Sequence, residues 1–253
     1  MDATFALALV VAATAAVRGV WSPCGLSMLS SITPMTEAGR GHRFSWTASW
    51  FTLGGAVGGL STGAVAALGA GAVAALDLAD TTRWALAAAI AIVTVAIDLG
   101  VGGISLPIFK RQVNDAWLRD YRSWVYGAGF GWQIGTGVAT YIMTAGVFLT
   151  IGLGVLTGSP LAALAIGGFF GLVRGSAVWI GRPATTPAAL GEVHDRLDRL
   201  APASRAAAAG AQALAAVVLA ALGLGAAAAA LVAVAIGVAV LAPRLGRRRA
   251  LPA

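Results

Sequence analysis

The chain has few charged residues and almost no cysteine. Charged residues make up 11% of its 253 residues, whereas a soluble domain carries about 25%. Such a chain cannot cover a globular surface with polar groups, so a water-soluble fold is excluded and lipid must be its solvent. The single cysteine, Cys24, excludes an internal disulfide. HExxH and CxxC motifs and a glycine-rich phosphate loop are absent as well, and we expect no metal and no cofactor.

Seven apolar segments are candidates to cross a bilayer, which takes roughly 20 helical residues. They cover residues 4–33, 45–76, 84–107, 124–155, 159–181, 206–223 and 226–242. The last two form one run interrupted at Gly223-Leu224-Gly225, which is either one very long helix or a hairpin of two short ones. We therefore predict an all-α polytopic membrane protein with six or seven spans, and we favour seven. We expect residues 182–205 to form a cytoplasmic loop that holds a short polar helix.

Basic residues gather in alternate connections between the spans. The net charge is +7, but these residues lie in short loops between apolar runs, so they set topology and do not indicate a nucleic-acid partner. Because cytoplasmic loops carry the excess of Lys and Arg, we predict an inner-membrane protein with its N-terminus outside and its C-terminus in the cytoplasm. The basic loop residues after the first, third and fifth spans are Arg40, Arg43, Lys110, Arg111, Arg119, Arg122, Arg182, Arg196, Arg199 and Arg205.

The two halves of the chain show weak internal similarity. Aligning them sets Trp21 against Trp132, and Gly100 against Gly225. Three spans per unit is an odd number, so the two units would enter the membrane from opposite sides, as in the inverted repeats of many transporters. We predict a single membrane domain over residues 1–253, with repeat one at 1–107, repeat two at 124–225 and an extra helix at 226–242.

Two spans carry glycine at every fourth residue, which brings each glycine back to nearly the same helix face. Such faces are flat, and another helix can pack closely on each of them. The two sets are Gly127, Gly131 and Gly135, and Gly167, Gly171 and Gly175.

Three charged residues lie inside predicted spans: Arg18, Asp98 and Arg174. Each follows the start of an inward-running span by about 15 residues, so the three share a depth of roughly 22 Å. A charge in hydrocarbon costs about 2.5–3.5 kcal/mol and should find a partner inside the bundle. We predict that Asp98 pairs with Arg18 or Arg174 and that the other arginine meets an anion or a carbonyl. Alternatively, Arg174 reaches toward the inner surface and Asp98 accepts only local hydrogen bonds.

The stretch SPCGLSMLSSITP, from Ser22 to Pro34, places Cys24 between two helix-breaking prolines, Pro23 and Pro34. It resembles the SPC…P pattern of the CcdA/DsbD family, whose members serve cytochrome c maturation and periplasmic thiol reduction. The segment GFGWQIGTG, from Gly129 to Gly137, resembles that family's GxGWTPCxG segment. The resemblance covers residues 1–225 and implies a six-helix inverted repeat. It also implies that reducing equivalents pass from a cytoplasmic thioredoxin-like partner to an outer thiol protein, with Cys24 and Pro23 in the reactive motif.

The second cysteine of that pattern is missing. It would lie near Ile134 and Gly135, just after Trp132, and neither position holds a cysteine. With Cys24 alone the chain can at most form a mixed disulfide, so thiol–disulfide exchange would need a partner's cysteine. Two alternatives stay open. One is a transporter of small, anionic solutes on the same scaffold, with Arg18, Asp98 and Arg174 as its site; the other is a structural membrane subunit in which Cys24 only fills space.

Overall fold

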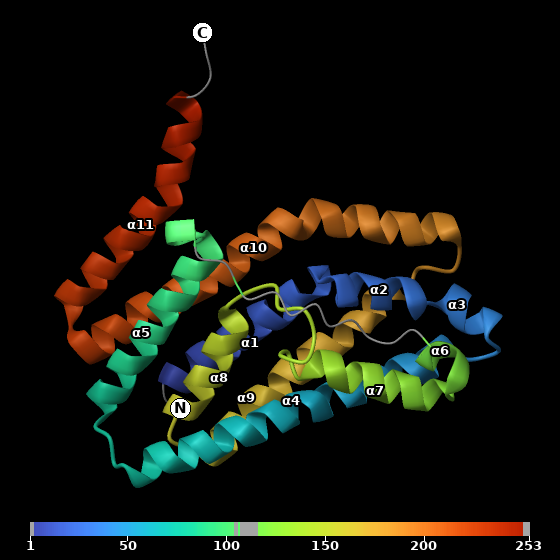
Figure 1. Ribbon diagram of the computed structural model, residues 1–253, viewed down its shortest axis with the longest axis horizontal. Helices are drawn as coiled ribbons and strands as arrows, with labels where there is room; N and C mark the ends of the chain where they lie inside the picture. The colour runs from blue at the N-terminus through green and yellow to red at the C-terminus, as the bar shows by residue number, and fades with distance from the viewer. Residues whose placement is uncertain (1–2, 104–105, 107–115, 250–253) are drawn as a thin grey trace.

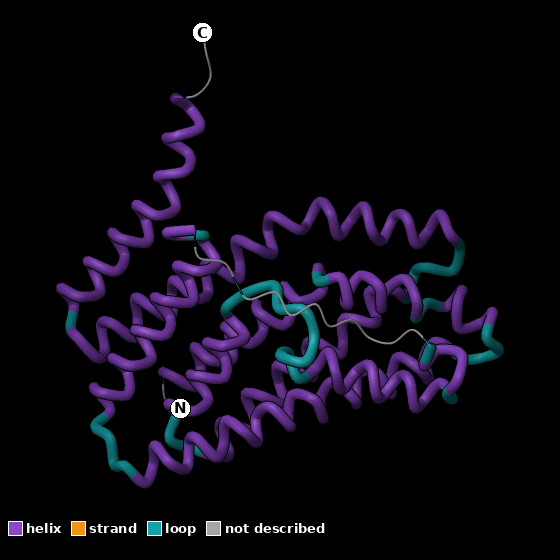
Figure 2. The backbone as a smooth tube through the Cα atoms, in the orientation of Figure 1, coloured by secondary structure: helices purple, strands orange, loops and turns teal. Residues whose placement is uncertain are grey.

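The computed structural model describes residues 3–103, 106 and 116–249, and helices dominate these residues (Figures 1 and 2). Within this part of the chain, 5 helical segments are long and apolar enough to cross a membrane. The prediction of an all-α polytopic membrane protein is therefore confirmed. The five segments are Thr4–Trp21, Phe44–Ala75, Asp80–Leu99, Pro160–Gly181 and Pro187–Leu224.

The first predicted span is one long path broken at its prolines. Helix α1 (Ala3–Arg18) passes through a 3₁₀ turn (Gly19–Trp21) into α2 (Pro23–Ser31), and α3 (Pro34–Gly39) follows. Each proline opens a helix, where its missing N–H costs nothing. The side chains of Ser22 and Thr33 cap the two helix starts. The helix breaks predicted at Pro23 and Pro34 are confirmed.

The fourth predicted span, 124–155, is not a single helix. It consists of α7 (Ser123–Gly135) and α8 (Gly146–Leu156), joined by an irregular segment at 136–145. The chain leaves α7 where Gly137 takes a left-handed conformation, with φ of 74°, and the hydroxyl of Thr136 accepts a hydrogen bond from the Ala139 amide at 3.2 Å. This side-chain bond takes the place of a helical backbone bond. A short helix, α6 (Trp117–Asp120), precedes α7.

The long helix α4 (Phe44–Ala75) forms the centre of the packing, and the glycine faces meet on it. From the start of α4 to its end, the contacted residues of α7 increase in residue number, whereas those of α9 (Pro160–Ser176) decrease. Helix α7 therefore runs parallel to α4, and α9 runs antiparallel to it (Figure 1). A Cβ at Gly131 would overlap the carbonyl oxygen of Phe51, and one at Gly171 would overlap that of Gly55. The prediction that these faces receive another helix closely is confirmed.

The end of the bundle differs from the predicted layout. Helix α10 (Pro187–Leu224) is continuous, so the expected loop at 182–205 shrinks to the residues before Thr186, which caps α10. Its polar first half is rich in Ala, Leu and Arg, which favour helix formation. The long apolar run then turns at Gly225, with φ of 92°, into α11 (Ala226–Arg249), which makes it a hairpin (Figure 1).

The third predicted span ends earlier than expected. Helix α5 (Asp80–Leu99) is closed by Gly100, which has φ of 70°. Glycine adopts this left-handed conformation without strain. A second 3₁₀ turn (Val101–Gly103) follows α5, and the 3₁₀ turn Ala177–Gly181 continues α9. The basic residues Lys110 and Arg111 lie outside the described residues.

Candidate functional site

Cys24 lies at the start of α2, just past the break in the first span. Its side chain is buried, and the Ser22 hydroxyl accepts a hydrogen bond from the Gly25 amide at 3.0 Å, which fixes the first turn of α2. Pro23 at the first helical position directs the chain out of the 3₁₀ turn. Cys24 therefore lies at a helix N-terminus, where the helix dipole places partial positive charge.

The guanidinium of Arg174 occupies the space beside this break. A Cβ on Gly19 would overlap Arg174 Nη1, so only glycine leaves room for the cation there. The side chain of Arg174 is 3% exposed, and its Nε has no hydrogen-bond partner among the described residues. Gly25, the residue after Cys24, packs on the carbonyl oxygens of Gly19 and Val20, so the start of α2 and the Arg174 guanidinium meet at the same 3₁₀ turn. The structure thus brings together a thiol, a helix N-terminus and a buried cation.

Gly135, the position that the predicted repeat sets against Cys24, forms a helix contact. A Cβ on Gly135 would overlap the carbonyl oxygen of Gly55. A cysteine, or any side chain, would force α7 away from α4 at this position. Trp132, one turn earlier, is 43% exposed and donates a hydrogen bond from Nε1 to Ser61 Oγ at 3.1 Å. Neither residue carries the thiol that a second redox motif would need.

Arg18 and Asp98 line the same space, whereas Arg174 does not. Two cavities of about 560 and 470 Å³ lie beside α5 and α10, and both are lined by Arg18, Asp98 and Arg205. The guanidinium of Arg18 donates from Nη1 to Ser204 Oγ at 3.0 Å and packs on the Trp21 ring. The three residues predicted to form one site therefore do not all lie together. Arg205, which the sequence predicts in a cytoplasmic loop, lines these cavities with Arg18 and Asp98, and Arg174 lines neither.

Asp98 is held by neutral donors and not by an arginine. It accepts hydrogen bonds from the Ala145 amide at 2.7 Å, from Gln212 Nε2 at 2.7 Å and from the Thr144 hydroxyl. Within the described residues it forms no salt bridge, so the predicted ion pair with Arg18 or Arg174 is not formed. The three donors come from α10 and from the end of the irregular segment, and they tie that segment to α5.

A buried carboxylate that sequence analysis missed lies on α3, next to the start of α4. Glu37 is 0% exposed. It accepts hydrogen bonds from the Tyr126 hydroxyl at 2.7 and 2.9 Å, from Thr47 at 2.5 Å and from Arg40 at 2.8 Å. The sequence could have pointed to this residue, because Glu37 is the only acidic residue between positions 3 and 76. Its full set of donors makes it a clamp between α3, α4 and α7.

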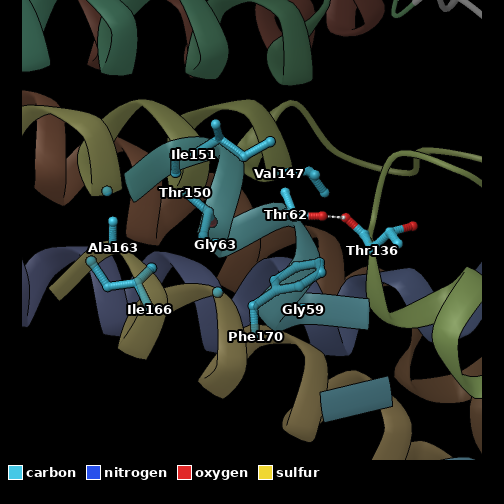
Figure 3. Close-up of a pocket in the computed structure, with 13 residues that line it drawn as sticks. Gly59, Thr62, Gly63, Thr136, Val147, Thr150, Ile151, Ala163, Ile166 and Phe170 are labelled. Atoms are coloured by element: carbon cyan, nitrogen blue, oxygen red, sulfur yellow. Dashed lines mark hydrogen bonds between the residues drawn. The ribbon is translucent and has the colours of Figure 1, made fainter. Parts of the chain in front are cut away.

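A further small cavity lies where α4, α8 and α9 meet (Figure 3). Its volume of about 20 Å³ holds roughly one water molecule. The figure shows Thr62 hydrogen-bonded to Thr136, where the Thr62 hydroxyl donates to the carbonyl oxygen at 2.9 Å. The remaining lining is apolar apart from Thr150, and includes Phe170 and Ile166. This cavity is too small and too apolar for a substrate.

Comparisons with known proteins point to methylamine-utilization proteins. The chain is 32% identical over 192 residues to the methylamine utilization protein MauF of Methylophilus methylotrophus, an alignment that covers 66% of this chain and 59% of that protein. It is 30% identical over 181 residues to MauF of Paracoccus versutus, covering 69% of this chain and 65% of that protein. The chain thus spans somewhat less than two thirds of the length of these relatives. No protein-family model and no solved structure matches it.

Proposed function

We propose that the chain is an inner-membrane accessory protein of methylamine utilization that exchanges disulfides through Cys24. The pathway comes from the name of the MauF relatives. The chemistry comes from one observation: Cys24 lies at the N-terminus of α2 beside the buried Arg174. The resemblance to the CcdA/DsbD pattern supports the same chemistry, while the relatives themselves are named only for methylamine utilization.

Exchange at Cys24 needs a partner that brings the disulfide. The Cys24 thiolate attacks one sulfur of the partner's disulfide, a new S–S bond forms, and the old one breaks. The electron pair leaves with the partner's second sulfur, which takes up a proton. Because the chain has one cysteine, a second partner with two thiols must then supply the electrons. Its first thiol attacks the Cys24 sulfur and displaces the first partner in reduced form, and its second thiol then releases Cys24 while the disulfide of the second partner forms. Arg174 would hold the negative charge of the thiolate during both steps.

Orientation in the membrane follows from where the basic connections lie. The glycine contacts place the start of α4, the start of α7 and the end of α9 at one end of the bundle. Arg40, Arg122 and Arg182 belong to the connections at this end. At the other end Arg83 Nη1 donates to the Thr157 carbonyl at 3.1 Å, which joins two connections poor in basic residues. This arrangement supports an outside N-terminus and a cytoplasmic basic end.

The inverted repeat stays part of the proposal. Its two units would run from the broken first span to α5 and from the broken fourth span to α10. Two features support it: each unit opens with an interrupted span, and each closes at a glycine with positive φ, Gly100 and Gly225. Helix α11 would be the additional element.

The experiment for the proposed function is acid trapping of thiols in native membranes, followed by alkylation and non-reducing gels. Wild type should show an adduct with a thioredoxin-like partner, and Cys24→Ser should show none. Arg174→Gln should lower the adduct yield about tenfold, and Arg174→Lys should restore part of it, because the lysine keeps the charge. A Cys24 thiol that stays reduced and unlabelled in wild type, with no adduct, would contradict the proposal.

Transport of a small anion is a second candidate function, favoured by the cavities that Arg18 and Asp98 line. The two candidates rank the same two variants in opposite order. If exchange is the function, Cys24→Ser abolishes growth on methylamine and Asp98→Asn does not. If transport is the function, Asp98→Asn abolishes it and Cys24→Ser is silent.

A further inference from the structure

The larger Arg18–Asp98 cavity has a charged end and an apolar wall. Arg18, Asp98 and Arg205 form the charged end, and the rest of its lining is apolar. Val95 and Leu99 on α5 contribute to the wall, and Ile236 and Val240 on α11 complete it. Its volume of about 560 Å³ falls in the range of small-molecule sites, roughly 300–1,000 Å³.

The charged end carries an excess of positive charge. Two arginines and one aspartate give a net charge of +1 among the described lining residues. Asp98 is already held by the Thr144 hydroxyl, the Ala145 amide and Gln212. It therefore does not neutralise either arginine by direct contact. A buried or membrane-embedded cation without a paired anion is costly, so the cavity favours an anionic group at this end.

Arg18 is in position to bind that group. Its side chain is 6% exposed, and its hydrogen bonds within the described residues leave from Nη1 and reach neutral oxygens of Ser204 and Ala201. The ring of Trp21 holds the guanidinium plane in place, with Cζ 5.8 Å from the ring centroid. The remaining guanidinium donors suit a phosphate, which arginine binds through two parallel hydrogen bonds.

We propose that this cavity binds an amphiphilic anion, with a phosphate at Arg18 and Arg205 and an acyl chain along α5 and α11. Membrane phospholipids with an acidic headgroup have this chemistry. The inference does not depend on exchange at Cys24, because neither Cys24 nor Arg174 lines this cavity. It gives α11 a function outside the proposed repeats, since Ile236 and Val240 form the wall that the acyl chain would touch.

The test is native mass spectrometry of the full chain in mild detergent, after addition of phosphatidylglycerol or of phosphatidylcholine with the same acyl chains. Wild type should retain phosphatidylglycerol about tenfold better, as expected when one charge-assisted contact is at stake. Arg18→Gln should remove this preference. Arg199→Gln changes an exposed arginine of the same helix as Arg205 and should leave it intact. Equal retention of the two lipids by wild type, or an unchanged preference in Arg18→Gln, would overturn the proposal.

Two further arms separate the headgroup from the chain. Inorganic phosphate should not displace phosphatidylglycerol at equal concentration; displacement would show a free-anion site and refute the amphiphile. Ile236→Trp fills the apolar wall while leaving both arginines, and it should lower phosphatidylglycerol retention to the level of phosphatidylcholine. Ile236 lies on α11, away from the glycine contacts of α4. This variant therefore tests the proposal even if Arg18→Gln does not fold into a monodisperse protein. Unchanged retention in Ile236→Trp would overturn the placement of the acyl chain.

Discussion

The two interrupted spans are broken in different ways. The first break is short: a 3₁₀ turn leads directly into α2, Ser22 caps the new helix, and the guanidinium of Arg174 fills the space beside Gly19. The second break is the longer irregular segment 136–145, held by hydroxyl groups of Thr136 and Thr144. Only the first break holds a thiol, with Arg174 packed against it, whereas the second break lines a cavity that it shares with Arg18 and Asp98.

This difference shows that the position compared with Cys24 is used for helix packing in the second interrupted span. On α7, the position that would match Cys24 presses directly on the backbone of α4. A close glycine contact of this kind stabilises a helix pair through dispersion and leaves no room for a side chain. The missing cysteine is thus part of the packing of α7 on α4, and restoring it by one substitution would disturb the bundle.

Gly135→Ala should have the largest effect of the variants that probe this comparison. The added Cβ overlaps the Gly55 carbonyl oxygen, and overpacking of this kind costs about 3 kcal/mol. The unfolding free energy, from titration with sodium dodecyl sulfate, should fall by that amount. Gly191→Ala is the matched control, because no atom lies within 4 Å of the Cβ it adds. Equal stability of the two variants would show that α7 does not pack on α4 as described.

Tyr126→Phe should rank second, because it weakens the Glu37 clamp, which joins α3 of the first interrupted span to α7 of the second. The change removes the one hydrogen bond that the tyrosine hydroxyl shares between the two carboxylate oxygens of Glu37. Hydrogen bonds to a charged group contribute about 1.5–3 kcal/mol, so we expect a loss of about 2 kcal/mol in the same titration. Tyr121→Phe, at an exposed tyrosine near the start of α7, is the control. A loss no larger than that of the control would mean that Glu37 does not depend on Tyr126.

Much of the fold was predictable from the sequence because membrane helices follow length and hydropathy. The breaks at Pro23 and Pro34 were predictable too, because proline is disfavoured inside a helix and favoured at its first turn. Pro202, in contrast, lies inside the continuous helix α10. The long irregular segment after α7 was not predictable, since residues 124–155 carry no charged residue and no proline. What breaks it is tertiary: Thr144 and Ala145 donate to Asp98, which lies on another helix.

The sequence identified charged residues of the candidate sites, but not which of them lie together. Depth along a helix correctly brought Arg18 and Asp98 to one cavity. The same argument also placed Arg174 with them, because depth says nothing about the direction in which a helix faces. Arg174 instead faces Gly19, where the missing side chain makes room for its guanidinium. The sequence alone did not show that these two residues are neighbours.

Gly19→Ala sharpens the comparison at the first break. The new methyl group displaces the Arg174 guanidinium, which is the flexible end of a side chain, so the expected cost is about 1 kcal/mol and smaller than at Gly135. The yield of the Cys24 adduct in the trapping experiment should also decrease, because the guanidinium is displaced. Gly39→Ala, where no atom lies within 4 Å of the new Cβ, should change neither quantity. A stable Gly19→Ala protein with full adduct yield would remove Arg174 from the mechanism.

Thr62→Val should give the smallest measurable effect and tests the second break directly. The variant keeps the shape of the side chain but loses the hydrogen bond from the Thr62 hydroxyl to the Thr136 carbonyl, which closes the end of α7 beside the small cavity (Figure 3). A single neutral hydrogen bond contributes about 1 kcal/mol. Thr82→Val, at an exposed threonine of α5, should stay within about 0.5 kcal/mol of wild type. If the two variants are equally stable, the second break is held by Asp98 alone, and its contact with α4 is incidental.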